Sequence, residues 1–107
     1  MELYEQKAKQ ILDKIDANKD TYLIFGISTC GYCKKTILYM NEHNLRYKYY
    51  DLDKYYEIFI MILNQIRKMR PSLNIKTDHQ TFPIIFYNNK FVGGYNDLVN
   101  SMTNNKI

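Results

Sequence analysis

The fold of this chain is decided by the segment Tyr22-Leu-Ile-Phe-Gly-Ile-Ser-Thr-Cys30-Gly-Tyr-Cys33-Lys-Lys35. Its apolar first part is rich in side chains that favour β-structure, which predicts a buried strand over residues 22–27. Its second part predicts an amphipathic helix that begins after an N-cap at Thr29 or Cys30. Cys30 and Cys33 are the chain's two cysteines. They therefore stand where a strand turns into a helix.

The start of this helix is a suitable place for a reactive thiol. The first turn of a helix has N–H groups without helical partners, and together with the helix dipole they favour a thiolate at Cys30. A thiolate is the nucleophile of thiol–disulfide exchange. Cys33 lies one helical turn further on, where it could attack a mixed disulfide formed on Cys30. The pair predicts a redox enzyme.

Hydrophobic periodicity predicts the elements on either side of this segment. Helices are expected over residues 3–16, from the cysteines to about residue 44, over 55–69 and after Gly94. Further strands are expected over 45–50, 84–87 and 90–92. The helix over 55–69 should bury an apolar stripe made of Tyr56, Phe59, Ile60, Leu63 and Ile66. Asn88 and Asn89 predict a two-residue hairpin turn, and Asn96 is expected to cap the last helix.

The order of these elements is α-β-α-β-α-β-β-α. A helix between the first two strands implies that they pair in parallel, whereas the hairpin adds antiparallel strands. We therefore predict an α/β fold with a central mixed four-stranded sheet flanked by helices. A chain of 107 residues has the length of one domain, so residues 1–107 are expected to form a single domain.

The composition narrows the function classes. Hydrophobic residues make up 46% and charged residues 24% of the chain, values typical of a soluble globular domain. No apolar run approaches the roughly 18–20 residues of a membrane span, and the charged N-terminus lacks a signal-peptide core. The net charge of +4 is spread along the chain, whereas a nucleic-acid binder usually gathers it on one element. We expect a cytoplasmic protein that binds neither membranes nor nucleic acid.

In that compartment an isolated Cys-x-x-Cys is catalytic or binds a metal more often than it forms a structural disulfide. A zinc site would need His43 and His79 to complete the ligand set of Cys30 and Cys33. The spacings between these four residues lie outside the usual zinc-finger pattern. Both histidines lie in polar segments and are predicted to be ordinary surface residues, so no metal is expected.

Three short motifs resemble those of the glutaredoxins, a family within the thioredoxin superfamily. They are Cys30-Gly31-Tyr32-Cys33, Thr81-Phe82-Pro83 and Gly93-Gly94-Tyr95-Asn96-Asp97, in the family's order and with about its spacing. The resemblance covers roughly residues 21–101. It implies a thioredoxin-like fold and a thiol–disulfide oxidoreductase that uses two cysteines.

The resemblance also implies roles for individual residues. Cys30 would be the nucleophile and Cys33 the resolving thiol, with Tyr32 beside the cysteinyl group of glutathione. A cis peptide bond before the proline would present a backbone edge to glutathione, like an added strand, in the motif Thr81-Phe82-Pro83.

The last motif would bind the other end of glutathione. The turn at Gly94 would let the ligand approach the backbone. The N–H groups of Asn96 and Asp97, at a helix start, would bind the γ-glutamyl carboxylate. The Asp97 side chain could in addition bind the γ-glutamyl ammonium group.

The chain departs from the family pattern at three positions. Ile27 stands where the family usually has a Lys or Arg for the glycyl carboxylate of glutathione. Gly31 stands where Pro is commonest, and Gln80 stands where a basic residue is frequent. Another cation is therefore needed for the glycyl carboxylate, and the candidates are Lys34, Arg70 and Lys76.

These features predict a glutathione-dependent thiol–disulfide oxidoreductase that acts as a monomer. Glutathione would be its co-substrate, with no tightly bound cofactor, and its protein partners would be disulfide-containing or glutathionylated proteins. One alternative is a thioredoxin-like reductant fed by a thioredoxin reductase, which the missing basic residue at Ile27 keeps open. Another is a glutathione-ligated iron–sulfur carrier, which the looser turn at Gly31 favours and the second thiol of Cys33 disfavours.

Overall fold

The structure is a computed structural model that describes residues 2–104, and its elements follow the predicted order. The helices are α1 (Glu2–Ala17), α2 (Gly31–Glu42), α3 (Tyr56–Met69) and α4 (Tyr95–Asn104). The strands are β1 (Tyr22–Gly26), β2 (Tyr47–Asp51), β3 (Ile84–Tyr87) and β4 (Lys90–Gly93). Two short 3-10 turns, η1 (Asp53–Tyr55) and η2 (Pro71–Leu73), flank α3. No helix within residues 2–104 is both long and apolar enough to cross a membrane.

The four strands form one mixed sheet in the order β2-β1-β3-β4. β1 and β2 are parallel, with Ile24 opposite Tyr49, whereas β3 pairs antiparallel with both β1 and β4. This arrangement confirms the predicted sheet. The turn between β3 and β4 also follows the sequence, because Asn88 and Asn89 have φ angles of 53° and 60°, as a type I′ turn requires.

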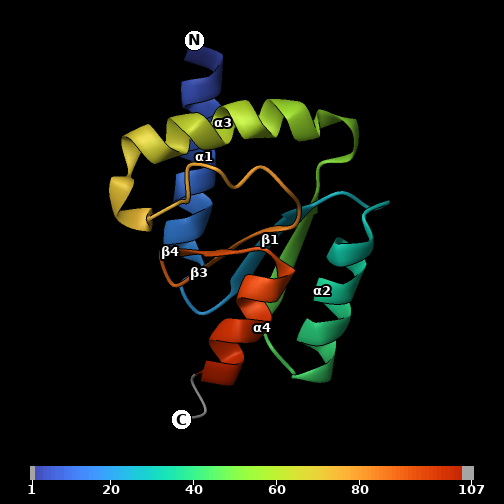
Figure 1. Cartoon of the computed structure of the whole chain (residues 1–107). Coiled ribbons are helices and arrows are strands. Elements are labelled where there is room, and N and C mark those ends of the chain that lie inside the picture. The colour runs from blue at the N-terminus through green and yellow to red at the C-terminus, as the bar shows by residue number, and fades with distance from the viewer. Residues whose placement is uncertain (1, 105–107) are drawn as a thin grey trace.

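Two helices cover each face of the sheet, as Figure 1 shows. α1 and α3 pack on the face formed by Leu23, Phe25, Ile84 and Phe86. α2 and α4 pack on the opposite face, where Met40 and Leu98 meet Ile24 and Ile85. The strand alternation therefore divides the core into two layers of apolar side chains. The end of β1 leads into the connection that carries Cys30, and this connection lies at the edge of the molecule (Figure 1).

The apolar stripe of α3 is only partly as predicted. Phe59, Leu63 and Ile66 are buried and Ile60 is half-buried, but Tyr56 is 41% exposed, so its assignment to the core was wrong. Tyr56 is the first residue of α3, and its ring meets Phe82 edge-on with the centroids 6.2 Å apart. A residue at the end of a helix can follow the helical spacing of apolar residues and still lie beyond the part of the helix that packs against the core.

Candidate functional site

Cys30 occupies the N-cap position of α2. Its backbone is extended, with φ −83° and ψ 124°, and its side chain makes no capping hydrogen bond. The Cys30 thiol is half-buried and donates to the carbonyl oxygen of Phe82 at 3.6 Å. The side chain is therefore at the positive end of the α2 dipole and within reach of solvent, as the sequence predicted.

Cys33 is in a different environment one turn further along α2. Its side chain is 1% exposed, and its sulfur accepts a hydrogen bond from the N–H of Ile27 at 3.5 Å. The pKa of Cys33 is raised to about 11, first by burial and also by the neighbouring Cys30, although the N–H of Ile27 and the hydroxyl of Tyr49 oppose this rise. The two thiols are thus chemically unequal: one is accessible, and the other is buried and protonated at neutral pH.

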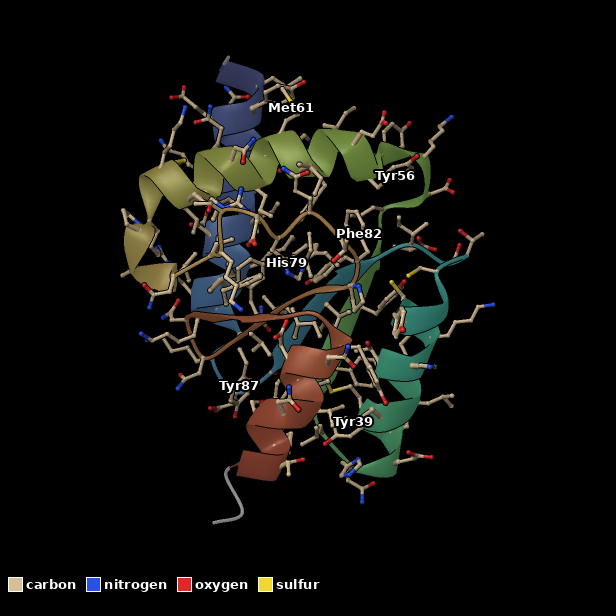
Figure 2. The ribbon with its side chains drawn as sticks, viewed as in Figure 1. Tyr39, Tyr56, Met61, His79, Phe82 and Tyr87 are labelled. Atoms are coloured by element: carbon tan, nitrogen blue, oxygen red, sulfur yellow. The ribbon has the colours of Figure 1, made fainter. Side chains whose placement is uncertain are left out.

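A groove of about 410 Å³ lies beside the accessible thiol, and its lining comes from three separate parts of the chain. The lining residues are Tyr32, His79, Thr81, Phe82, Pro83, Gly94, Tyr95, Asn96 and Asp97. The groove therefore brings together the residues that the sequence analysis assigned to glutathione binding, apart from the three candidate cations. The Phe82–Pro83 peptide bond is cis, as predicted. Figure 2 shows Phe82 between Tyr56 at the start of α3 and the start of α2, with His79 further back along the same loop.

The far end of the groove is the N-terminus of α4. The carbonyl of Gly94 accepts the first helical hydrogen bond, from the N–H of Leu98 at 3.0 Å, so Gly94 is the N-cap. The expectation that Asn96 caps this helix was wrong, because Asn96 already lies in its first turn. The carboxylate of Asp97 performs the capping instead and accepts from the N–H of Gly94 at 2.9 Å. Helical geometry leaves the first-turn N–H groups available to an anion.

Aromatic side chains form the wall of the groove next to the cysteines. Tyr32 is 52% exposed, and its ring centroid lies 6.1 Å from that of Tyr95. The Lys35 ammonium stands over the Tyr32 ring, 4.9 Å from its centroid. This cation–π contact holds a positive charge near the active-site turn.

His79 was predicted to be an ordinary surface residue, and that prediction was wrong. It is half-buried, lines the groove, and lies edge-on to Phe91 with the ring centroids 5.1 Å apart. Its Nε2 is buried without a hydrogen-bond partner in the described structure. A Cβ added to Gly94 would lie 3.5 Å from Cε1 of His79, so the imidazole packs directly against the glycine turn. A single histidine in a polar loop gave no sequence signal of this contact.

The other histidine lies away from the site. His43 follows α2 and stacks on Tyr39, with the centroids 4.0 Å apart. It is therefore at the opposite end of α2 from Cys30. Across residues 2–104, no group of three His, Cys, Asp or Glu side chains is placed to hold a metal ion.

The candidate replacements for a basic residue at position 27 do not reach the groove. Lys34, Arg70 and Lys76 are absent from its lining. Arg70 instead forms a bidentate ion pair with Asp16, with distances of 2.7 and 2.9 Å. Ile27 is half-buried beside Cys33. The thiol end of the groove is therefore poorer in positive charge than the sequence analysis expected.

A second and larger groove, of about 500 Å³, lies between α1, α3 and the β2 edge of the sheet. Its lining is mostly apolar and includes Tyr4, Ile11, Tyr50 and Phe59. Lys7 and Lys14 are its charged residues, and it contains no thiol, imidazole or carboxylate. By size alone this groove would be the candidate site, but the smaller groove is the better candidate because it lies beside the reactive thiol of Cys30.

A thioredoxin-like fold with an accessible and a buried thiol one helical turn apart defines a thiol–disulfide oxidoreductase. The sequence model of the glutaredoxin family matches residues 22–92, which run from the start of β1 into β4 and include both cysteines. The chain belongs to the glutaredoxin family.

Individual relatives agree with this assignment. A probable glutaredoxin of Acanthamoeba polyphaga mimivirus is 32% identical over 89 residues, which are 82% of this chain and 84% of the viral protein. Glutaredoxin-2 of Schizosaccharomyces pombe is 31% identical over 91 residues, which are 85% of this chain and 74% of the yeast protein.

Solved structures show the same fold. A buckwheat glutaredoxin–glutathione complex superimposes with a TM-score of 0.66 at 20% identity, over 99% of this chain and 88% of the plant protein. A dithiolic glutaredoxin from Trypanosoma brucei brucei gives a TM-score of 0.61 at 25% identity, over 90% and 89% of the two chains.

Proposed function

We propose that this chain reduces glutathione mixed disulfides and protein disulfides, with glutathione as its co-substrate. One observation supports the proposal above the others. The sulfur of Cys30 lies 3.6 Å from the carbonyl oxygen of Phe82, a residue that lines the groove, so a ligand in the groove would have its own sulfur close to the accessible thiol. The related buckwheat protein was solved as a complex with glutathione, and we extend that ligand to this chain.

The proposed chemistry is two successive exchanges. The Cys30 thiolate attacks the glutathionyl sulfur of a mixed disulfide, and the other thiol leaves and takes up a proton. A second glutathione thiolate then attacks the new Cys30–glutathione disulfide and forms oxidised glutathione. Alternatively, the Cys33 thiolate attacks Cys30, and glutathione leaves. Protein disulfides would follow the second route, in which both cysteines end as an intramolecular disulfide.

Glutathione would lie along the groove with its cysteinyl part beside Tyr32 and its backbone against the edge at Phe82. Its γ-glutamyl carboxylate would meet the first-turn N–H groups of α4, where the helix dipole favours an anion. Its γ-glutamyl ammonium would meet the Asp97 carboxylate, of which one oxygen already accepts from Gly94. With Ile27 in place of a cation, the γ-glutamyl end would provide most of the recognition.

We further propose that the protein acts as a monomer in the cytoplasm, where glutathione is kept reduced. Its protein substrates would carry accessible disulfides or glutathionylated cysteines. The reaction needs no tightly bound cofactor, because electrons move between sulfur atoms.

The test is reduction of the mixed disulfide of glutathione and β-mercaptoethanol, coupled to glutathione reductase. Cys30→Ser should abolish activity, because no other accessible thiol lies at the groove in the described structure. Cys33→Ser should retain it, since free glutathione can resolve the intermediate. Equal loss in both variants, together with turnover of the wild-type protein when a thioredoxin reductase replaces glutathione as electron donor, would instead favour the thioredoxin-like alternative. A coloured protein as purified would point to the iron–sulfur carrier.

A further inference from the structure

A glycine makes room for a tyrosine hydroxyl beside the buried thiol. Gly26 is the last residue of β1. A Cβ added there would lie 2.7 Å from the hydroxyl oxygen of Tyr49 and 2.8 Å from the sulfur of Cys33. Real Cβ atoms essentially never approach other heavy atoms that closely. The hydroxyl and the thiol therefore occupy the space that a side chain at position 26 would take.

The sheet register explains why these groups meet. Tyr49 lies opposite Ile24 in the parallel β1–β2 pair, and side chains two residues apart on a strand share a face. Gly26 is therefore on the same face as Ile24, the face covered by α2. The Tyr49 ring extends along this face to the end of β1, where Cys33 projects from the first turn of α2. Because the phenol is fixed on a strand and the thiol on a helix, their contact is set by the fold.

The electrostatics fit a tyrosine that donates a hydrogen bond. Burial raises the pKa of Tyr49, and the neighbouring Cys33 and Asp51 raise it further, so the phenol keeps its proton throughout the neutral range. Hydrogen bonding from Tyr49 lowers the pKa of Cys33, in opposition to burial. Cys30 and Asp51 are the other ionisable groups that act on this pair within the described residues.

We propose that Tyr49 is a positioning residue for the resolving step, in which its hydroxyl donates a hydrogen bond to the Cys33 sulfur as that sulfur becomes a thiolate. This inference rests on the proposed function, because it assigns Cys33 the attack on the Cys30–glutathione disulfide. The N–H of Ile27 already donates to the buried sulfur, and the hydroxyl would be its second donor. Such donors stabilise the charged form of a group that burial disfavours.

The step balances without any further reactant. Cys33 loses its proton, and its sulfur attacks the sulfur of Cys30. The bond between Cys30 and the glutathionyl sulfur breaks, and the bond between Cys33 and Cys30 forms. The Cys33 sulfur is oxidised, the glutathionyl sulfur is reduced, and the departing glutathione thiolate takes up one proton through water.

The expected effect of Tyr49→Phe on the resolving step follows from the loss of one hydrogen-bond donor to the Cys33 thiolate. A hydrogen bond to a charged group corresponds to about one to two pKa units, so Tyr49→Phe should reduce the Cys33 thiolate fraction about tenfold to a hundredfold. A thiolate of higher pKa is also the stronger nucleophile, and this offsets about half of the effect on a logarithmic scale. The intramolecular step at pH 7 should therefore slow by roughly threefold to tenfold.

The experiment mixes the reduced full-length protein with oxidised glutathione, quenches with acid at intervals and counts the species by mass spectrometry. The Cys30–glutathione adduct and the intramolecular disulfide differ in mass, so the two steps are measured separately. The matched control is Tyr47→Phe, which removes a hydroxyl from the same face of the same strand two residues away. Both variants are checked for folding by thermal unfolding before the kinetics.

Slowing confined to the second step, in Tyr49→Phe and not in Tyr47→Phe, is the expected result. If Tyr49→Phe resolves the adduct at the wild-type rate, the inference is overturned and the proposed function stands. If both steps slow equally, Tyr49 has a structural role only, and the inference is again overturned. If neither the Cys30 adduct nor the intramolecular disulfide forms in the wild-type protein, and Cys33→Ser forms no adduct either, the proposed function itself fails.

Discussion

Asp97 has two separable tasks in this structure, and two substitutions distinguish them. Its carboxylate caps α4 by accepting from the N–H of Gly94 at 2.9 Å, and its charge lines the groove. Asp97→Ala removes both features. Asp97→Asn keeps an acceptor oxygen of the same reach and removes the charge. Comparison of Asp97→Asn with the wild-type protein therefore isolates what the charge contributes to ligand recognition, and comparison of Asp97→Ala with Asp97→Asn isolates what the capping oxygen contributes.

The cost to stability should be unequal. Losing a capping side chain lowers the free energy of unfolding by about 0.5–2 kcal/mol, so Asp97→Ala should fall in this range. Asp97→Asn should lose only the interaction of a negative charge with the helix N-terminus, about 0.3–1 kcal/mol. Denaturant unfolding of both variants measures these values, with an unchanged slope expected in each case.

The cost to recognition should be large in both variants. A lost hydrogen bond between charged groups is worth about 1.5–3 kcal/mol, which is roughly tenfold to a hundredfold in affinity for the γ-glutamyl ammonium group. Asp97→Asn should lie near the lower end of that range, because its amide oxygen still accepts. A second substrate, the mixed disulfide of cysteinylglycine and β-mercaptoethanol, lacks the γ-glutamyl group and should be reduced at close to the wild-type rate.

The assay is the second-order rate constant for reduction of each mixed disulfide by the reduced protein, followed by acid quench and mass spectrometry. The ratio of the two rate constants removes any general loss of activity. If Asp97→Asn and the wild-type protein give the same ratio, the carboxylate does not bind the γ-glutamyl ammonium group. The proposed orientation of glutathione would then be wrong, whatever the stability measurements give.

Two further substitutions test the charges around the groove. Ile27→Lys should tighten glutathione binding at low salt, because it adds a cation beside the thiols. Ile27→Met adds no charge and is the control. A gain in affinity that persists at high salt would contradict an electrostatic cause. Arg70→Ala should lower the free energy of unfolding by no more than about 1 kcal/mol at pH 7, because the ion pair with Asp16 lies at the surface, with side chains that are 28% and 46% exposed. The guanidinium lowers the pKa of Asp16, so this stabilisation is present above the ordinary carboxyl pKa of about 4 and is lost as the pH falls below it. An Arg70→Ala difference that persists in acid would show that the arginine acts through packing.

The order of the elements could be predicted because the local signals agreed with one another. The apolar strand before Cys30, the helical stripe around Leu63 and the paired asparagines of the hairpin each indicate one structure only. The predictions that were wrong concern positions whose environment depends on distant parts of the chain. Tyr56 follows the helical period, but it lies at the start of α3, where Phe82 covers its ring only in part. Asn96 is a good capping residue by type, yet Gly94 and Asp97 cap α4.

The lining of the groove could be predicted to the extent that it lies in short motifs. His79 was missed because its burial comes from Phe91 and the glycine turn, both distant in sequence. The contact between Tyr49 and Cys33 was missed for a similar reason. In the sequence Tyr49 is one of several tyrosines on a half-exposed strand. Only the parallel register and the missing side chain at Gly26 bring its hydroxyl to the sulfur.

The space at Gly26 also limits how this chain can change. While Tyr49 fills that space, even an alanine at position 26 would collide with two groups. Conversely, a smaller residue at position 49 would leave a void beside the buried thiol, which a side chain at position 26 could fill. The two positions are therefore epistatic, and the order of substitution matters. Tyr49 must be replaced by a smaller residue before Gly26 can be replaced by a larger one. Relatives with a side chain at the end of this strand should have a smaller residue in place of the tyrosine.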